Sequence, residues 1–228
     1  MHTKFSKSQL KSKFLTTFGA NYLISMGVIK RQGLKNTIAT YIGFGIGFLN
    51  LIVIQPHFLS KEELGLTRVL YSFSLLVAMF VPMGIGNATT RFFPLFKNIE
   101  KRHHGYLGFM LLFPLVGFIL AALGLLLFKD AIMARYAAES PMFNEFYFYV
   151  FPMTFAVSFL SVLSIYCSVN FKSTIPTYLN DIVVRIMTIA VVSMYYVKWL
   201  DLDQFIMAFT GIYVVQMLGL LGYIFQFD

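Results

Sequence analysis

Charged side chains are scarce in this sequence, and their scarcity excludes a water-soluble globular fold. Lys, Arg, Asp and Glu make up 12% of the 228 residues, whereas 58% are hydrophobic and the mean hydropathy is +0.73. A soluble domain of this length needs more polar surface than such a composition supplies. We therefore predict that most of the chain lies in a lipid bilayer.

Cysteine and the residue patterns of common catalytic sites are also nearly absent. Cys167 is the only cysteine, which excludes an internal disulfide. The sequence has no His-Glu-x-x-His motif, no Gly-x-Ser-x-Gly motif and no Walker loop. We therefore do not expect an enzyme, and we expect no catalytic residues, resident cofactor or bound metal.

Two short polar pairs have metal-binding residue types, but their surroundings favour solvated loops. Asp201 and Asp203 resemble the metal-binding pair of sugar transferases, yet they lie in a short loop expected to face outward, where nucleotide sugars are absent. His103 and His104 directly follow two cations, which favours an interfacial basic loop.

The formal charge of +8 could indicate nucleic-acid binding, but the positions of the cations argue against it. A nucleic-acid surface gathers cations on one polar face, often beside exposed aromatic residues. Here the cations fall between apolar segments. The expected partner is membrane lipid, and no nucleic acid is expected.

Six segments are long and apolar enough to cross a membrane, which requires about 20 residues for about 30 Å of hydrocarbon. Short connections between them predict antiparallel neighbouring helices. The fold class is therefore expected to be an all-α integral membrane bundle with about six transmembrane helices, at 38–58, 69–90, 106–128, 146–171, 178–197 and 205–227.

The distribution of cations between alternate loops predicts the orientation, because Lys and Arg are retained on the cytoplasmic side. Both termini are then cytoplasmic, and the protein is a multi-pass protein of the cell inner (cytoplasmic) membrane. The cation-rich set contains Lys4, Lys7, Lys11, Lys13, Lys30, Arg31, Lys35, Arg91, Lys97, Lys101, Arg102 and Lys172, against Lys61, Arg68, Lys129, Arg135 and Lys198 on the other side.

Residues 1–30 are expected to form a basic cytoplasmic tail that precedes a six-helix transmembrane lobe at 31–228. The tail loosely imitates a secretory signal, but polar residues interrupt its apolar part and no convincing cleavage site follows. Met26 is an alternative natural start of translation.

Polar and small residues recur at helical spacing within three of the spans, although lipid-facing positions have no reason to carry them. One interpretation is close helix packing with hydrogen bonds across the bundle. The other is a hydrated cavity where the stripes converge. The stripes are Asn36, Thr40, Gly43, Gly47 and Asn50 in the first span, Gly84, Asn87 and Arg91 in the second, and Thr154, Ser158, Ser161 and Ser168 in the fourth.

The fifth span carries two ionisable residues, Asp181 and Arg185, whose four-residue spacing places them on one helix face. Ionisable groups at such depth usually face the protein interior or a cavity. Arg185 therefore either lines a cavity or forms a structural ion pair with Asp181. Arg91 closes the second span on the cation-rich side, where it either anchors the helix or joins a cavity.

Four segments together resemble the amino-terminal region of bacterial polysaccharide and lipopolysaccharide biosynthesis flippases. These flippases belong to the superfamily that also contains the MATE drug exporters and the lipid II flippase. The segments are 30–43 (KRQGLKNTIATYIG), 58–66 (FLSKEELGL), 84–94 (GIGNATTRFFP) and 175–182 (IPTYLNDI).

This resemblance implies two six-helix lobes around a cavity that opens alternately to each membrane face. Its substrate would be a polyprenyl-diphosphate-linked oligosaccharide, such as an O-antigen, capsule or other surface polysaccharide unit. A cationic cavity suits a diphosphate. Transport could be coupled to H⁺ or Na⁺, with Asp181 as the cation acceptor. The candidate substrate-binding residues are Arg185, Asp181, Arg91, Asn87 and Asn50.

The chain supplies only one of the two lobes that the resemblance implies. We therefore expect a fragment, a truncated reading frame or half of an assembly, whose partner is the missing second lobe or another copy. Two other functions stay open. A MATE-like cation exporter would favour acidic cavity residues, and an integral-membrane enzyme of envelope glycan assembly would need a large outward loop.

Overall fold

The computed structural model describes residues 30, 32–96, 105–136 and 140–226, so nearly all of the expected tail at 1–30 lies outside it. Of the described residues, 89% are helical and none lies in a strand. This confirms the expected all-α membrane class with about six spans. Within the part of the chain that the structure describes, five helices are long and apolar enough to cross a membrane, namely Gln32–Phe58, Tyr106–Leu127, Tyr147–Val169, Thr174–Tyr196 and Leu202–Phe225.

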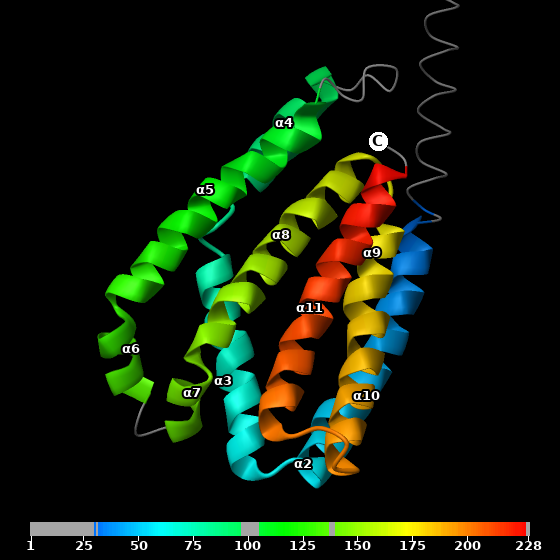
Figure 1. Cartoon of the computed structure of the whole chain (residues 1–228). Helices are drawn as coiled ribbons and strands as arrows, with labels where there is room; N and C mark the ends of the chain where they lie inside the picture. Colours follow the sequence, from blue (N-terminus) through cyan, green and yellow to red (C-terminus); the bar gives the residue numbers. More distant parts are fainter. Residues whose placement is uncertain (1–29, 31, 97–104, 137–139, 227–228) are drawn as a thin grey trace, which may run out of the picture.

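The second expected span, 69–90, is not one continuous helix. It is divided into α3 (Lys61–Ala78) and α4 (Ile85–Phe96) by turns at 79–84. Met83 and Gly84 have φ angles of 46° and 81°, which no α-helix contains, and Pro82 precedes them. Figure 1 shows that α3 and α4 follow one another from one end of the bundle to the other.

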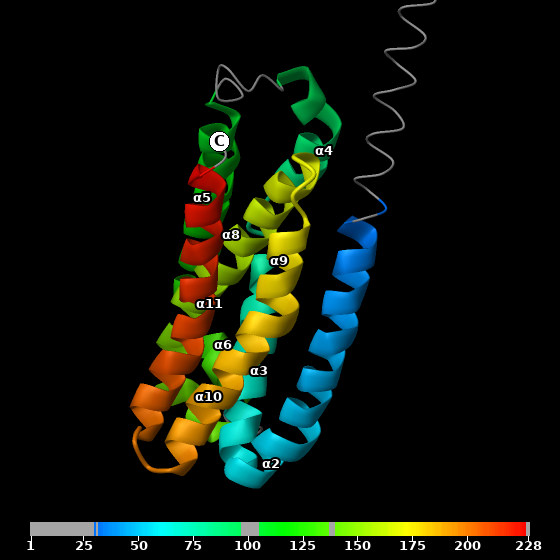
Figure 2. The same cartoon turned by 90° about the vertical axis from the view of Figure 1, so that its right-hand side faces the viewer.

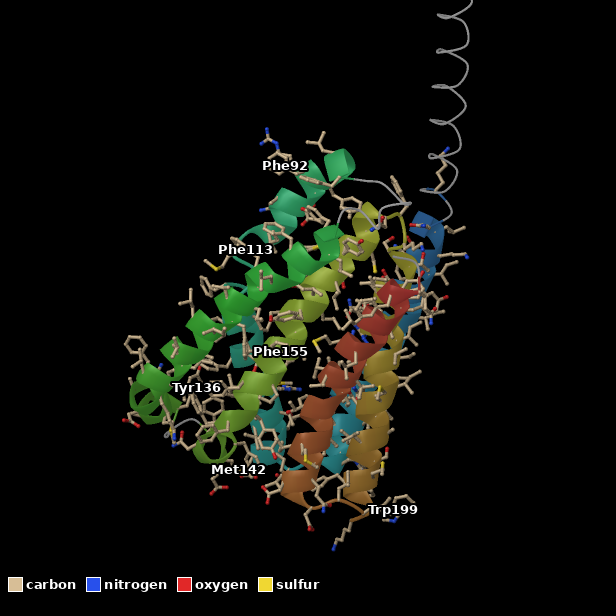
Figure 3. The ribbon with its side chains drawn as sticks, turned by 45° about the horizontal axis from the view of Figure 1, so that its top comes forward. Phe92, Phe113, Tyr136, Met142, Phe155 and Trp199 are labelled. Carbon is tan, nitrogen blue, oxygen red and sulfur yellow. The ribbon has the colours of Figure 1, made fainter. Side chains whose placement is uncertain are left out.

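Apart from the turn between α3 and α4, the described helix ends gather at two opposite ends of the bundle (Figures 1 and 2). One end holds the start of the first span, the end of α4 and the start of α5 (Tyr106–Leu127). The other holds the short helices α2 (Gln55–Phe58), α6 (Lys129–Tyr136) and α7 (Pro141–Glu145). Phe92 and Trp199 mark these opposite ends in Figure 3.

α8 (Val150–Val169), which follows the short helix η3 (Tyr147–Tyr149), is the central helix. It packs against α3, α4, α5 and α11 (Leu202–Phe225). Tyr166 and Leu163 on α8 belong to one buried apolar cluster, and Met153, nearer the other end, belongs to a second. These two clusters hold α8 in the middle of the bundle.

The fifth span is formed by α9 (Thr174–Tyr178), η4 (Leu179–Val183) and α10 (Val184–Tyr196) in direct succession. The first span, which ends in η1 (Leu49–Ile54) and α2, runs along it at one edge of the bundle (Figure 2). A Cβ on Gly43 would lie 2.7 Å from Cβ of Asp181. Glycine at position 43 is therefore what allows the two backbones to approach.

The start of α11 shows what Asp201 does. The Asp201 main-chain N–H donates a 3.2 Å hydrogen bond to Gln204 Oε1. This bond satisfies one of the N–H groups that a helix start leaves without an intrahelical partner. Asp201 is exposed, as a solvated loop residue is expected to be.

Candidate functional site

A polar cleft of about 750 Å³ lies among the first span, α3, α8, α10 and α11. Apolar atoms make up most of the exposed wall, and Leu51, Val157 and Phe209 are among the lining residues. The polar side chains that line it are Asn50, Gln55, Thr67, Arg68, Tyr71, Ser161, Ser164, Asn180, Asp181, Arg185, Thr188, Tyr213 and Gln216. Polar groups from five segments therefore converge between helices that are otherwise apolar.

Arg185 lies at the contact between the fifth and first spans. Its Nη1 donates a hydrogen bond to the main-chain oxygen of Gly43. A Cβ on Gly47, one turn further along, would come within 2.6 Å of the guanidinium carbon. Gly47 thus makes room for the half-buried guanidinium, and the Gly43 carbonyl accepts a hydrogen bond from one of its nitrogens.

Asp181 and Arg185 both line the cleft, but they bind different partners. The Asp181 carboxylate accepts a 2.7 Å hydrogen bond from the Thr40 hydroxyl. Within the described part of the chain, Asp181 and Arg185 form no ion pair with each other. Each side chain bonds to the first span instead, Asp181 to the Thr40 hydroxyl and Arg185 to the main-chain oxygen of Gly43.

Asn50 supplies a polar atom without a partner. Its side chain is 4% exposed, and its Oδ1 accepts no hydrogen bond from any described residue. A buried amide oxygen without a donor is costly. The Oδ1 atom is itself buried, so a ligand hydroxyl would reach it only after neighbouring side chains move. Nearby, the Gln216 amide donates to Asn180 Oδ1 and links α11 to η4.

The structure brings together three of the five residues expected at the substrate site. Asn50, Asp181 and Arg185 all line the cleft. Asn87 and Arg91 are exposed on α4 and do not belong to its lining. The turns at 79–84 separate α4 from α3, so Asn87 and Arg91 on α4 do not face the cleft.

Arg68 is a cleft residue that the sequence pattern did not reveal. We counted Arg68 among the cations of the loops, but α3 already begins before it. Ser60 and Glu63 form reciprocal capping hydrogen bonds of 3.2 and 2.8 Å at that helix start. Because α3 begins at Lys61, Arg68 lies about 10 Å along the helix axis from its start. The Ser-x-x-Glu capping signature was the signal that could have located it.

The side chains of the cleft suit an anionic ligand that also carries hydroxyl groups. Two guanidinium groups, Arg68 and Arg185, face the same space as hydroxyl and amide side chains. Arginine binds phosphate oxygens through two parallel N–H groups. Among the residues that the structure describes, no group of three or more His, Cys, Asp or Glu is placed to hold a metal ion.

The chain was compared with protein-family models, with curated proteins and with solved structures. None of the three comparisons found a match.

Proposed function

We propose that this chain is a MATE-like lobe of a flippase that moves a polyprenyl-diphosphate-linked oligosaccharide across the cytoplasmic membrane. The observation that carries the proposal is the position of Arg185, which lines a cleft among apolar spans and has no ion pair with a described carboxylate. Its charge is therefore available to a ligand.

The diphosphate is the substrate group that this arrangement suits best. A charge inside a membrane is costly unless it is hydrated or paired, and this holds for the ligand as well as for the protein. A guanidinium in the cleft compensates a diphosphate that has left bulk water. Arg68, on α3, adds a second cation to the same cleft.

The uncharged part of the cleft suits a glycan. Sugar hydroxyls are both donors and acceptors, and the cleft offers the hydroxyls of Ser161 and Ser164. Asp181, already hydrogen-bonded to Thr40, is the candidate acceptor for a coupling H⁺ or Na⁺. Alternating access then requires a partner, which is a second lobe or another copy of the chain.

The test is flipping in inverted membrane vesicles from cells that carry each variant in place of the native chain. A radiolabelled polyprenyl-diphosphate-linked oligosaccharide is added outside, and translocation is measured as its protection from an external glycosidase. We expect protection with the native chain, a loss of at least about tenfold for Arg185→Ala, and a partial loss for Arg185→Lys, which keeps the charge without the bidentate geometry.

Arg135→Ala is the matched control, because Arg135 is an exposed arginine on α6 outside the cleft. It should flip at the native rate. The proposal fails if Arg185→Ala inserts at the native level and protects the glycan at the native rate, or if the native chain gives no protection above vesicles that lack it.

A further inference from the structure

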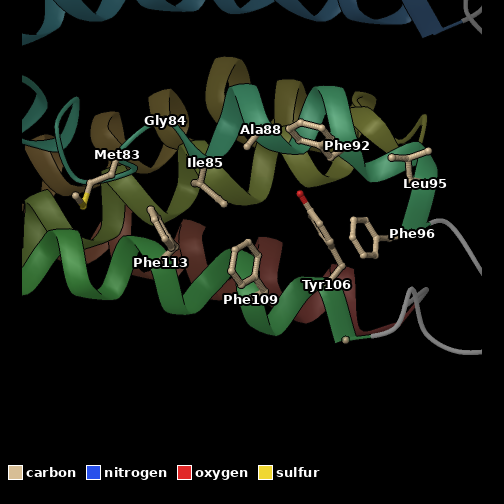
Figure 4. Close-up of a pocket in the computed structure, with 11 residues that line it drawn as sticks. Met83, Gly84, Ile85, Ala88, Phe92, Leu95, Phe96, Tyr106, Phe109 and Phe113 are labelled. Carbon is tan, nitrogen blue, oxygen red and sulfur yellow. The ribbon is translucent and has the colours of Figure 1, made fainter.

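A second hollow, distinct from the polar cleft, lies between α4 and α5. It is a groove of about 740 Å³, and apolar side chains line it almost completely. Figure 4 shows rings and aliphatic side chains from both helices facing this space. The principal lining residues are Met83, Ile85, Phe92, Phe96, Phe109 and Phe113.

The polar hydroxyl group in the wall of the groove is already satisfied. Tyr106 lines the groove, and its hydroxyl donates a 3.2 Å hydrogen bond to Thr89 Oγ1. The groove also begins where the second span breaks, because Met83 and Gly84 of the turn form part of its lining. What remains for a ligand is a hydrocarbon surface with aromatic edges.

A cation stands beside this apolar surface. Arg91 is exposed on α4, and its guanidinium carbon lies 5.6 Å from the ring centroid of Phe92, a lining residue. It forms no ion pair with a carboxylate in the described part of the chain. Arg91 lies about 7.5 Å before the end of α4, so its long side chain reaches toward the headgroup level.

We propose that the groove binds one acyl chain of an anionic phospholipid, whose phosphate pairs with Arg91. α5 is one of the candidate spans, so the groove opens where lipid hydrocarbon is the surrounding solvent. An apolar chain matches the wall, and a negative headgroup matches the cation beside it. A second protein copy would have to supply a carboxylate at this position to satisfy Arg91 equally well.

Tryptophan quenching by brominated lipids tests this site directly. Trp199 is the only tryptophan and lies at the opposite end, so Trp199→Phe gives a silent background. Phe113→Trp then places a probe in the groove. Leu115→Trp places a control about 3 Å deeper on another exposed face of α5. The purified chain is reconstituted with brominated phosphatidylglycerol or brominated phosphatidylcholine in an unbrominated host.

We expect the groove probe to prefer phosphatidylglycerol by about fivefold, the effect of about one cationic side chain near a charged headgroup. The control probe should show no preference. Arg91→Gln should abolish the preference of the groove probe, whereas Lys61→Gln, which removes an exposed cation at the other end, should keep it.

Two results would overturn the site. Equal quenching of both probes by both lipids would mean bulk contact only, and a groove probe shielded from both lipids would mean that protein covers the groove. Folding of each variant is checked by the protection of the buried Cys167 thiol, and Phe109→Trp is the alternative groove probe.

Discussion

Thr40 on the first span donates a 2.7 Å hydrogen bond to the carboxylate of Asp181 on the fifth. Nearer the end of the bundle, Asn36 donates to Ser173 Oγ at 3.1 Å along the same contact. Polar groups thus join the first span to the fifth in this half of the contact, whereas Phe58 stacks on Tyr196 at its other end. Much of the remaining surface of the first span is exposed and apolar. Loss of one of these bonds leaves a polar group without a partner where water is scarce.

Thr40→Val should therefore destabilise the bundle by about 0.5–2 kcal/mol, the range of interhelical hydrogen bonds in membranes. Thr37→Val is the matched control, because the Thr37 hydroxyl bonds to Gly33 within its own helix. Unfolding in detergent can be followed with a thiol-reactive dye, since Cys167 is the only cysteine and is buried. Equal unfolding temperatures for the two variants would contradict a docking role for Thr40.

Gly43→Ala should destabilise the bundle more than Gly45→Ala. A Cβ at position 43 would collide with the backbone and Cβ of Asp181, which cannot move without shifting the fifth span. Position 45 has no neighbour within 4 Å, and alanine there should stabilise the helix by about 0.5–1 kcal/mol. The dye assay ranks the two variants. If Gly43→Ala is as stable as Gly45→Ala, the first and fifth spans do not approach each other closely at Gly43.

Gly84→Ala should lower stability by about 1–2 kcal/mol, because Gly84 has a φ of +81° that strains any residue with a Cβ. Gly65→Ala is the control, because Gly65 lies within α3 and has open space around it. A continuous second span would abolish the expected difference, since both alanines would then stabilise the helix.

The two ends of the bundle can be assigned by labelling. In a Cys167→Ala background, an impermeant maleimide should label Lys198→Cys in intact cells and Lys101→Cys only after permeabilisation. The expectation rests on the distribution of cations. Lys101 itself lies outside the described residues. External labelling of Lys101→Cys would place the cation-rich end outside and overturn the orientation.

Hydropathy alone was enough to predict a helical bundle of about six spans, because length and apolarity are what a bilayer requires of a crossing helix. It did not predict the break at 79–84, since an average over a window hides a change of backbone direction. Pro82 and Gly84 were the local signal, and their effect depends on the left-handed turn that Met83 and Gly84 adopt.

The candidate site was predictable only where side chains follow an unbroken helix. Asn50 and Arg185 lie in the cleft as their spacing suggested, whereas the break separates Arg91 from it. An ion pair between Asp181 and Arg185 was one of two interpretations, and it does not form among the described residues, because each side chain bonds to the first span instead. The contacts of Gly43 with Asp181 and of Gly47 with Arg185 depend on packing between distant segments. Residue spacing within one helix does not specify such contacts.

The binding of an isoprenyl diphosphate to the cleft tests the central claim most directly. Geranylgeranyl diphosphate and geranylgeraniol are titrated by calorimetry into the purified chain in detergent, with Arg185→Gln and, as the control, Arg135→Gln on the exposed surface of α6. Because a hydrogen bond to a charged group contributes about 1.5–3 kcal/mol, Arg185→Gln should weaken diphosphate binding by about 10- to 100-fold. Binding of the alcohol should not change, and Arg135→Gln should retain the native affinity for the diphosphate. Equal affinity of the native chain and Arg185→Gln for geranylgeranyl diphosphate would contradict the account.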